Sequence, residues 1–465
     1  MTIRLAKTAE RVAGMAAIVL GLALYLLNLS TMGLVSVDEP RYAAIGQAMA
    51  RSGDWLTPRL WGQPWFEKPV LLYWITGFGF RLGFGPELAP RLPVAVLSLA
   101  FLVFFWFRVR TLWSLPVATY AVAILATSVG WLAYSHIAIT DIPLAAAFSA
   151  ALLLALGEGL GGRRAIAVAA LLGVAVLAKS LIACIFFAPV LLLDRRWKAL
   201  LRPVPVGAFL LVVLPWHILC ALQNGPEFFR VLFLEHQFGR ATSTALQHVQ
   251  PFWYYVPVLA MLLFPWFPLL ALAPRPRGNA QIRTLWAVVG FGFVFLSATV
   301  NKLPHYPLPL LPALAILLAL GLARASRPDR AIIAPLALLG LLPLAAQVAP
   351  QALAHGLRQA QASAASALWI VVLGGGAWLV TRAAPFRRFA VPLALFTAAL
   401  AFFWFEVTVF PAVDQAATAR PLWVRERPSC APANKRFLIY GLSYYAGKAV
   451  PECHVLDPQH DSVVR

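Results

Sequence analysis

Two adjacent carboxylates, Asp38 and Glu39, directly follow a long apolar stretch, in a chain with only 12% charged residues. The next residues are Pro40, Arg41 and Tyr42. A carboxylate held at a bilayer edge by an ion partner can act as a general base on a hydroxyl. The alternative is a helix start, with Asp38 as the cap, Pro40 in the first turn and Glu39 favouring the helix dipole. A further alternative makes Glu39 and Arg41 an exposed ion pair.

A second charged pair, Glu67 and Lys68, stands among aromatic residues later in the same polar segment. A partly desolvated ammonium and a phosphate attract each other strongly, so Lys68 is a candidate for binding a lipid phosphate. The alternative is a lysine that reaches toward the interface beside an aromatic belt.

Asp141 lies between two apolar stretches, two residues before Pro143. An ionisable group so near the membrane interior is costly unless it has a partner or a wet cavity. A helix cap is again the alternative. If Asp38, Lys68 and Asp141 lie on one side of the membrane, they can share a cavity.

Two more polar segments contain candidate residues. The first holds Glu235, His236 and Arg240; a Glu and a His close together can bind a metal, although two ligands are weak evidence. The second holds Lys302 and Tyr306 among prolines, which disturb any helix and leave backbone groups that need burial or a wet cavity. Lys302 and Tyr306 are therefore further phosphate-binding candidates.

Apolar blocks dominate the chain of 465 residues, which is 61% hydrophobic. Most blocks reach or approach the ~20 residues needed to cross a bilayer. The sequence therefore predicts an all-α polytopic membrane protein. About thirteen transmembrane helices are expected, at 12–32, 89–107, 116–134, 143–157, 165–178, 180–194, 203–221, 254–273, 284–300, 306–323, 331–349, 366–383 and 389–408.

The charge balance is 38 Lys and Arg against 18 Asp and Glu, a formal net charge of +20. In a membrane protein the first explanation is topology, because basic residues gather in cytoplasmic loops. With a cytoplasmic N-terminus, the cytoplasmic segments receive most of the basic excess. The outer side then receives loops 33–88 and 222–252 and a C-terminal tail, so we expect the function on that face.

This topology divides the chain into a membrane domain, 1–408, and a small outer C-terminal region, 409–465. Cys430 and Cys453 both lie in that region, where oxidation is permitted, and a disulfide between them is as plausible as two free thiols. Cys184 and Cys220 fall in or beside spans as apolar fillers. No Gly-rich phosphate loop, CxxC pair or HExxH helix is present, which removes support for P-loop ATPases and the common zinc classes.

Together, these motifs resemble the lipid A aminoarabinose transferases, which are grouped with the protein O-mannosyltransferases among the GT-C glycosyltransferases. Order and spacing agree over about residues 10–325. The resemblance rests on the runs Asp38-Glu39-Pro40-Arg41-Tyr42-Ala43, Ser52-Gly53-Asp54-Trp55, Phe66-Glu67-Lys68-Pro69, Thr140-Asp141-Ile142-Pro143, Glu235-His236 and Lys302-Leu303-Pro304-His305-Tyr306. Residue 40 departs from the family, which commonly has Thr there, and the C-terminal tail is shorter than usual.

The resemblance implies a GT-C fold and a monomeric enzyme of the bacterial inner membrane, with its active site facing the periplasm. Such an enzyme takes a sugar from a polyprenyl (undecaprenyl) phosphate donor and transfers it with inversion at the anomeric carbon. The acceptor would be lipid A or another envelope glycan or protein, and no cofactor is required. The implied roles are catalytic carboxylates Asp38 and Asp141, donor phosphate binding by Lys68 with Arg240 or Tyr306, a site lined by Arg41 and Tyr42, and a possible divalent metal at Glu67 and His236.

Three alternatives remain at this stage. A lipid-linked glycan transporter or flippase would place polar groups at the bilayer midplane near a broken helix, whereas the candidates here cluster in outer loops. A protein O-mannosyltransferase-type enzyme would differ in its acceptor. A membrane scaffold would leave the charged residues as unrelated caps and anchors, whose substitution is silent.

Overall fold

The computed structural model describes residues 15–157, 159–193, 195–239, 249–383, 387, 389–433 and 435–453. These residues are mostly helical, which confirms the all-α class. Among them, the only paired strands form a short antiparallel hairpin, β1 (Arg59–Leu60) with β2 (Gln63–Pro64).

Within the described residues, six helical segments are long and apolar enough to cross a membrane. A seventh span is formed if α5 (Leu115–Ala126) and α6 (Val129–Ser135), which meet at a bend of 61°, are counted together. The six are α4 (Leu88–Leu112), α10 (Pro203–Asn224), α14 (Ala280–Ala298), the segment Pro328–His355 with α16 (Pro328–Ala331), α17 (Ile333–Leu339) and α18 (Leu342–His355), the segment Ala364–Arg382 with η7 (Ala364–Ala367) and α19 (Leu368–Arg382), and α20 (Ala390–Ala417).

The remaining apolar helices are shorter than the ~20 residues of a full span. Each of the predicted ranges overlaps a helix or a broken pair of helices, but the count of about thirteen spans stays a prediction. The shorter helices are Met15–Leu26, α7 (Asp141–Ala155), α8 (Gly162–Ala178), α9 (Ile182–Leu193), α13 (Tyr255–Leu262), η4 (Phe267–Leu272), η5 (Leu308–Leu310) and α15 (Leu311–Arg324). The linking helices are η1 (Arg195–Leu201), α11 (Pro226–Phe229), η2 (Arg230–Gly239), η3 (Phe252–Tyr254) and η6 (Leu357–Gln359).

The core forms around α7 and α15, whose residues are almost all buried. Alanines make up much of α7, and small side chains let it pack closely against α4 and α8. The outer helices instead expose large apolar side chains, such as Leu211 and Leu222 on α10 and Val371 on α19. Continuous apolar surface of this kind fits lipid, which agrees with a multi-pass membrane protein.

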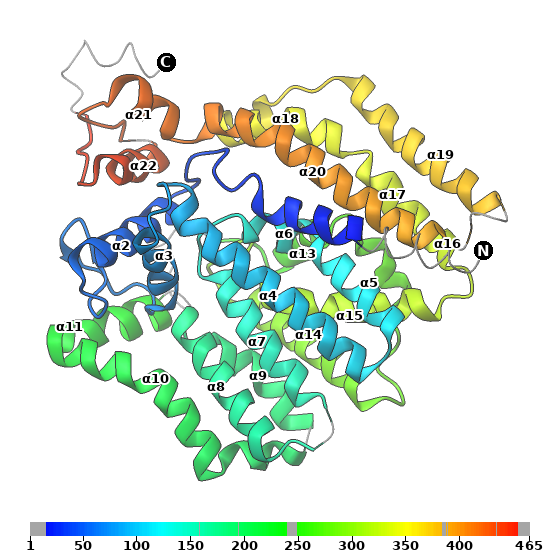
Figure 1. Cartoon of the computed structure of the whole chain (residues 1–465), viewed down its shortest axis with the longest axis horizontal. Coiled ribbons are helices and arrows are strands. Elements are labelled where there is room, and N and C mark those ends of the chain that lie inside the picture. Colours follow the sequence, from blue (N-terminus) through cyan, green and yellow to red (C-terminus); the bar gives the residue numbers. More distant parts are fainter. Residues whose placement is uncertain are drawn as a thin grey trace.

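The first outer segment is a folded layer. Its helices are α2 (Asp38–Ser52) and α3 (Leu71–Arg81), with the β1–β2 hairpin between them in sequence. Figure 1 shows α2 and α3 at the left of the molecule, with α22 (Arg436–Ala446) above them and α11 below. Contacts join α2 to both α3 and α22. The segment is therefore positioned by the membrane helices and by the C-terminal region together.

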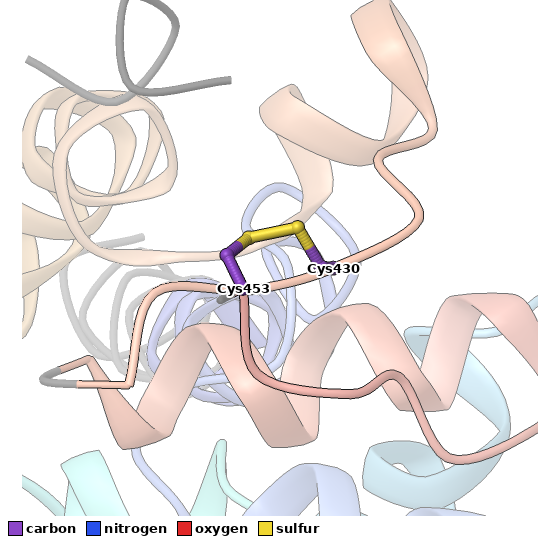
Figure 2. The surroundings of a disulfide bond; sticks show 2 residues. All are labelled: Cys430 and Cys453. Carbon is purple, nitrogen blue, oxygen red and sulfur yellow. A yellow bond between two sulfur atoms is a disulfide. The ribbon is translucent and has the colours of Figure 1, made fainter. Parts of the chain in front are cut away.

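The C-terminal region has a small apolar cluster of its own, formed with α21 (Arg420–Glu426) and α22. Cys430 and Cys453 form a disulfide, which decides between the two alternatives for these cysteines (Figure 2). Beside it, the two segments that carry these cysteines pair through backbone hydrogen bonds, from Ala431 N to Pro451 O and from Cys453 N to Ala431 O. Helix α20 continues past residue 408 to Ala417, and the predicted domain division stays a prediction.

Candidate active site at the outer end of the helices

Asp38 is the first residue of α2. The helix starts where the sequence predicts, but the cap interpretation is wrong, because Val37 occupies the N-cap position and no side-chain cap bond forms. The Asp38 carboxylate instead accepts a hydrogen bond from the Arg41 guanidinium one turn along the helix. Its side chain is 32% exposed, so the carboxylate is both held by a cation and open to solvent.

Glu39 and Arg91 fix the chain that leads into α2. Both side chains are fully buried, with Arg91 Nε 2.7 Å from Glu39 Oε1 and Arg91 Nη2 2.8 Å from Oε2. Arg91 also donates to the carbonyls of Leu29, Met32 and Gly33 at 2.7–2.9 Å. The prediction of an exposed Glu39–Arg41 pair is therefore wrong: Glu39 faces inward on α2, where the long arm of Arg91 on α4 reaches it.

Aromatic rings surround the Arg41 guanidinium. Its Cζ lies 5.6 Å from the ring centre of Trp65 and 5.2 Å from that of Tyr440 on α22, with Tyr42 at 6.0 Å. Cations over aromatic faces are attracted by the ring quadrupole. The outer segment and the C-terminal region thus contribute rings to the same cation, and they orient it toward Asp38.

Asp141 forms a second charged centre at the first turn of α7. Its Oδ1 accepts a bond from Lys179 Nζ at 2.5 Å, and its Oδ2 lies 3.8 Å from His305 Nε2. Lys179 Nζ also lies 4.5 Å from the centre of the Tyr306 ring. The Asp141 side chain is only 2% exposed, so this carboxylate is occupied by its partners and is not a helix cap.

Lys68 joins the two centres electrostatically. It is buried, and it interacts with both Asp38 and His305, while His305 in turn interacts with Asp141, Lys179 and Asp38. We call Asp38, Arg41, Lys68, Asp141, Lys179 and His305 the charge cluster. It brings the three residues that the sequence placed on one side of the membrane into one region, as expected.

The charge cluster fixes the protonation of two of its members. Burial alone would raise the pKa of Asp38, but the charges of Arg41 and Lys68 and the hydrogen bond from Arg41 together outweigh burial and keep that pKa below its usual value. Burial lowers the pKa of His305 to about 4, against the opposing attraction of Asp141. Near neutral pH, Asp38 is therefore a carboxylate and His305 is a neutral imidazole.

These protonation states predict how the transfer rate depends on pH. Wild type and His305→Gln should share one profile between about pH 5.5 and 8, because His305 stays neutral throughout that range. Loss of the Asp38 charge should affect both proteins only at more acidic pH. Initial rates with both substrates saturating would test this. An inflection near pH 6.5 in wild type that is missing in His305→Gln would contradict it.

The Lys179–Asp141 pair predicts a loss of stability when only one partner is removed. Lys179→Met should lower the free energy of unfolding by about 3 kcal/mol, because a buried carboxylate is left unpaired. The double variant Asp141→Leu/Lys179→Met should recover part of that loss. Thermal unfolding of the detergent-solubilised chain would measure both effects, and two simply additive losses would contradict the coupling.

Other predicted site residues lie apart from the charge cluster or outside the described residues. The Lys302 ammonium donates to the backbone carbonyls of Gln250, at 3.0 Å, and Thr299. Arg240 and the side chain of His236 lie outside the described residues. Substrate binding by these residues stays a prediction.

The predicted metal site consists of Glu67 and His236, and the side-chain contacts of Glu67 bear on it. Glu67 Oε2 lies 3.7 Å from Arg41 Nη1, a cation that competes for the same carboxylate. Within the described part of the chain, no group of three His, Cys, Asp or Glu side chains gathers as metal ligands do. A metal at Glu67 and His236 stays a prediction.

Sequence reasoning missed Lys179, Tyr440 and the partner role of Arg91. Lys179 carries a signal, since it is the only charged residue between Arg164 and Asp194. Arg91 and Tyr440 carry none, because each meets its partner across a distance in sequence that no local pattern reports.

Comparisons with known proteins show which proteins this chain resembles. Residues 67–219 match the family described as dolichyl-phosphate-mannose-protein mannosyltransferase. An undecaprenyl phosphate-α-4-amino-4-deoxy-L-arabinose arabinosyl transferase of Pseudomonas aeruginosa is 33% identical over 412 residues, which cover 83% of this chain and 73% of that protein. A transferase of the same name from Edwardsiella ictaluri is 33% identical over 63% of this chain and 56% of its own length.

Two solved structures have the same fold. The crystal structure of ArnT from Cupriavidus metallidurans bound to undecaprenyl phosphate gives a TM-score of 0.76 at 24% identity, covering 95% of this chain and 85% of that one. Its apo form gives a TM-score of 0.75 at 23% identity, covering 96% and 90%. This likeness confirms the predicted GT-C fold.

Proposed function

Because the chain belongs to the family of undecaprenyl phosphate-α-4-amino-4-deoxy-L-arabinose arabinosyl transferases, we propose that it moves an aminopentose from undecaprenyl phosphate to lipid A. We place this reaction on the periplasmic face of the inner membrane. One observation carries the proposal: an accessible carboxylate, Asp38, stands beside the cations Arg41 and Lys68, and His305 links it to the Asp141–Lys179 pair.

The cations suit the leaving group. In the transfer, an acceptor oxygen attacks the anomeric carbon while the bond to undecaprenyl phosphate breaks, and that phosphate departs with the electron pair. Cations fixed before the reaction stabilise the charge that develops on the leaving oxygen. Lys68 is buried, and Lys179 is held by the carboxylate of Asp141, so little reorganisation of these two cations is needed.

Asp38 can act on the anomeric carbon and on the acceptor. Its carboxylate can stabilise positive charge on the anomeric carbon and, for a hydroxyl acceptor, remove the proton. A phosphate acceptor is already ionised and needs no base. In-line attack from the face opposite the leaving group inverts the sugar.

Asp141 has a different role in this proposal. Since Lys179 and His305 occupy its carboxylate, Asp141 acts as a positioning residue that holds Lys179 in place. The rings of Tyr42 and Tyr306 flank Arg41 and Lys179, and we assign them the orientation of those two cations.

Reconstitution tests this function directly. The purified chain in vesicles should convert lipid A and the undecaprenyl-phosphate-linked aminopentose into lipid A heavier by one aminopentose, detected by mass spectrometry. A chain that moves the donor between leaflets without forming that product would be a transporter. A chain that modifies only added peptides would be a protein glycosyltransferase, and either result would overturn the proposal.

A further inference from the structure

A cationic pocket lies beside α2, away from the charge cluster. It has a volume of about 240 Å³ and is bounded by α2, the tip of the β1–β2 hairpin and the residues after α22. Its charged lining residues are Arg51 and Lys448, and the part of the chain that lines it contributes no Asp or Glu. A volume below the roughly 300 Å³ of a drug-sized site suits one headgroup moiety.

The two cations are available to a ligand. Both are exposed, and within the described residues no acidic side chain forms an ion pair with Arg51 or Lys448. An arginine fork and a lysine ammonium together match a phosphate group, the first bidentate and the second as a point charge.

The hairpin tip supplies a second, independent observation. Trp61 lines the pocket and has a φ of 51°, followed by Gly62 with a φ of 85°. Two-residue hairpin turns of this kind prefer Asn, Asp or Gly at their first position, and a bulky residue there costs on the order of 1 kcal/mol. Trp61 occupies this position despite its conformational cost, and its indole lines the pocket, where the flat face of the ring can pack on a sugar ring.

The pocket and the charge cluster lie on one face of α2. Arg41, Ala44, Ala48 and Arg51 follow the spacing of three and four residues that makes a single stripe along a helix. Arg41 and Arg51 are about 15 Å apart along the helix axis, at 1.5 Å per residue. Helix α22 runs beside this stripe, with Tyr440 at Arg41 and Gly447 near Arg51.

We propose that this pocket binds a second phosphate of the lipid acceptor, while the acceptor group that receives the sugar lies at the charge cluster. The inference rests on the proposed function. It assigns Arg51, Lys448 and Trp61 to acceptor recognition, and it gives the C-terminal region a part in substrate choice.

A structural explanation exists for the same cations. Arg51 lies in the last turn of α2, where a positive charge is favourable to the helix dipole, and Lys448 follows the end of α22. That explanation predicts a small loss of stability on substitution and no effect on the acceptor. A single set of variants can therefore distinguish the two explanations.

The test compares Arg51→Gln/Lys448→Gln with wild type on lipid A carrying two phosphates or one. With two phosphates, the double variant should raise the KM for lipid A about tenfold and leave kcat within about twofold. With one phosphate, wild type should already show the high KM, and the variant should not differ from it. Lys448→Glu should raise the KM further than Lys448→Gln, because it repels the anion.

The matched control is Arg425→Gln/Arg436→Gln, which removes two exposed charges from α21 and α22 outside the pocket. It should behave as wild type. An unchanged KM in the pocket variant, or an equal rise with both forms of lipid A, would overturn the inference. So would a defect that follows the phosphatidylglycerol content of the vesicles, since the pocket would then bind a bilayer headgroup.

Binding of the two forms of lipid A to the full-length chain, measured by native mass spectrometry without donor, separates this inference from the proposed function. If wild type prefers two phosphates and the pocket variant loses that preference, the inference holds even without transfer. If wild type transfers sugar but neither binds nor uses the two forms differently, the inference fails and the function stands.

Discussion

Replacing Asp38 by Asn should lower the rate of sugar transfer at least about a thousandfold, because the reaction depends on the carboxylate charge. Asn keeps the shape and can still accept a bond from Arg41. The arrangement of α2 should therefore survive, and binding of undecaprenyl phosphate should change little. Single-turnover transfer with purified protein measures the loss, and the thermal unfolding temperature reports the fold.

Asp54→Asn is the matched control for this variant. Asp54 lies in the same outer segment, with a side chain 28% exposed, and it has an arginine partner in Arg59 at 3.7 Å. Its Oδ1 accepts from the backbone of Leu56 and Thr57, which an Asn oxygen can also do. Transfer should stay within about twofold of wild type. Equal activity of the two variants would remove Asp38 from the reaction.

Replacing Arg91 by Met should destabilise the protein by about 4 kcal/mol, since it leaves the buried Glu39 carboxylate without its cation. Three backbone carbonyls of residues 29–33 would lose their donor as well. Because these bonds hold the chain that enters α2, transfer should fall together with stability. Thermal unfolding in detergent measures the first effect and initial rates measure the second.

Arg327→Met is the control for the loss of an arginine. Its guanidinium also binds a carboxylate, Asp329, at 2.8 and 3.0 Å, but the Arg327 side chain is 39% exposed. Solvent screens a guanidinium this exposed, so the loss of stability should be clearly smaller than for Arg91→Met. The double variant Glu39→Gln/Arg91→Met should recover part of the stability of Arg91→Met. A loss for Arg91→Met no larger than for Arg327→Met would contradict the structural role of the buried pair.

The local features of the site could be predicted from the sequence, and its long-range pairs could not. The start of α2 at Asp38 follows from the residues beside it. Charge asymmetry between loops predicts the outer location of Asp38, Lys68 and Asp141, which stays a prediction. The partners of Glu39 and Asp141 come from other helices, 52 and 38 residues away in the chain. Spacing along the sequence predicts on which face of its own helix a side chain lies. It does not predict which residue of another helix packs against that face.

The spans show the same division. Apolar blocks located the helices, because burial in lipid demands apolar residues whatever the tertiary structure. Where helices break, as between α5 and α6 with their bend of 61°, hydropathy still reads one continuous block. Apolar composition therefore predicts which segments lie in the membrane. Where a helix breaks within such a segment depends on local backbone geometry.

Mass spectrometry of lipid A from a deletion strain tests the central claim most directly. The strain would be complemented with wild type or with Asp38→Asn, at matched levels of membrane-inserted protein. We expect an aminopentose mass on lipid A that is lost on deletion and restored by wild type only. Full rescue by Asp38→Asn, or an unchanged lipid A in the deletion strain, would contradict an enzyme that uses Asp38 to glycosylate lipid A.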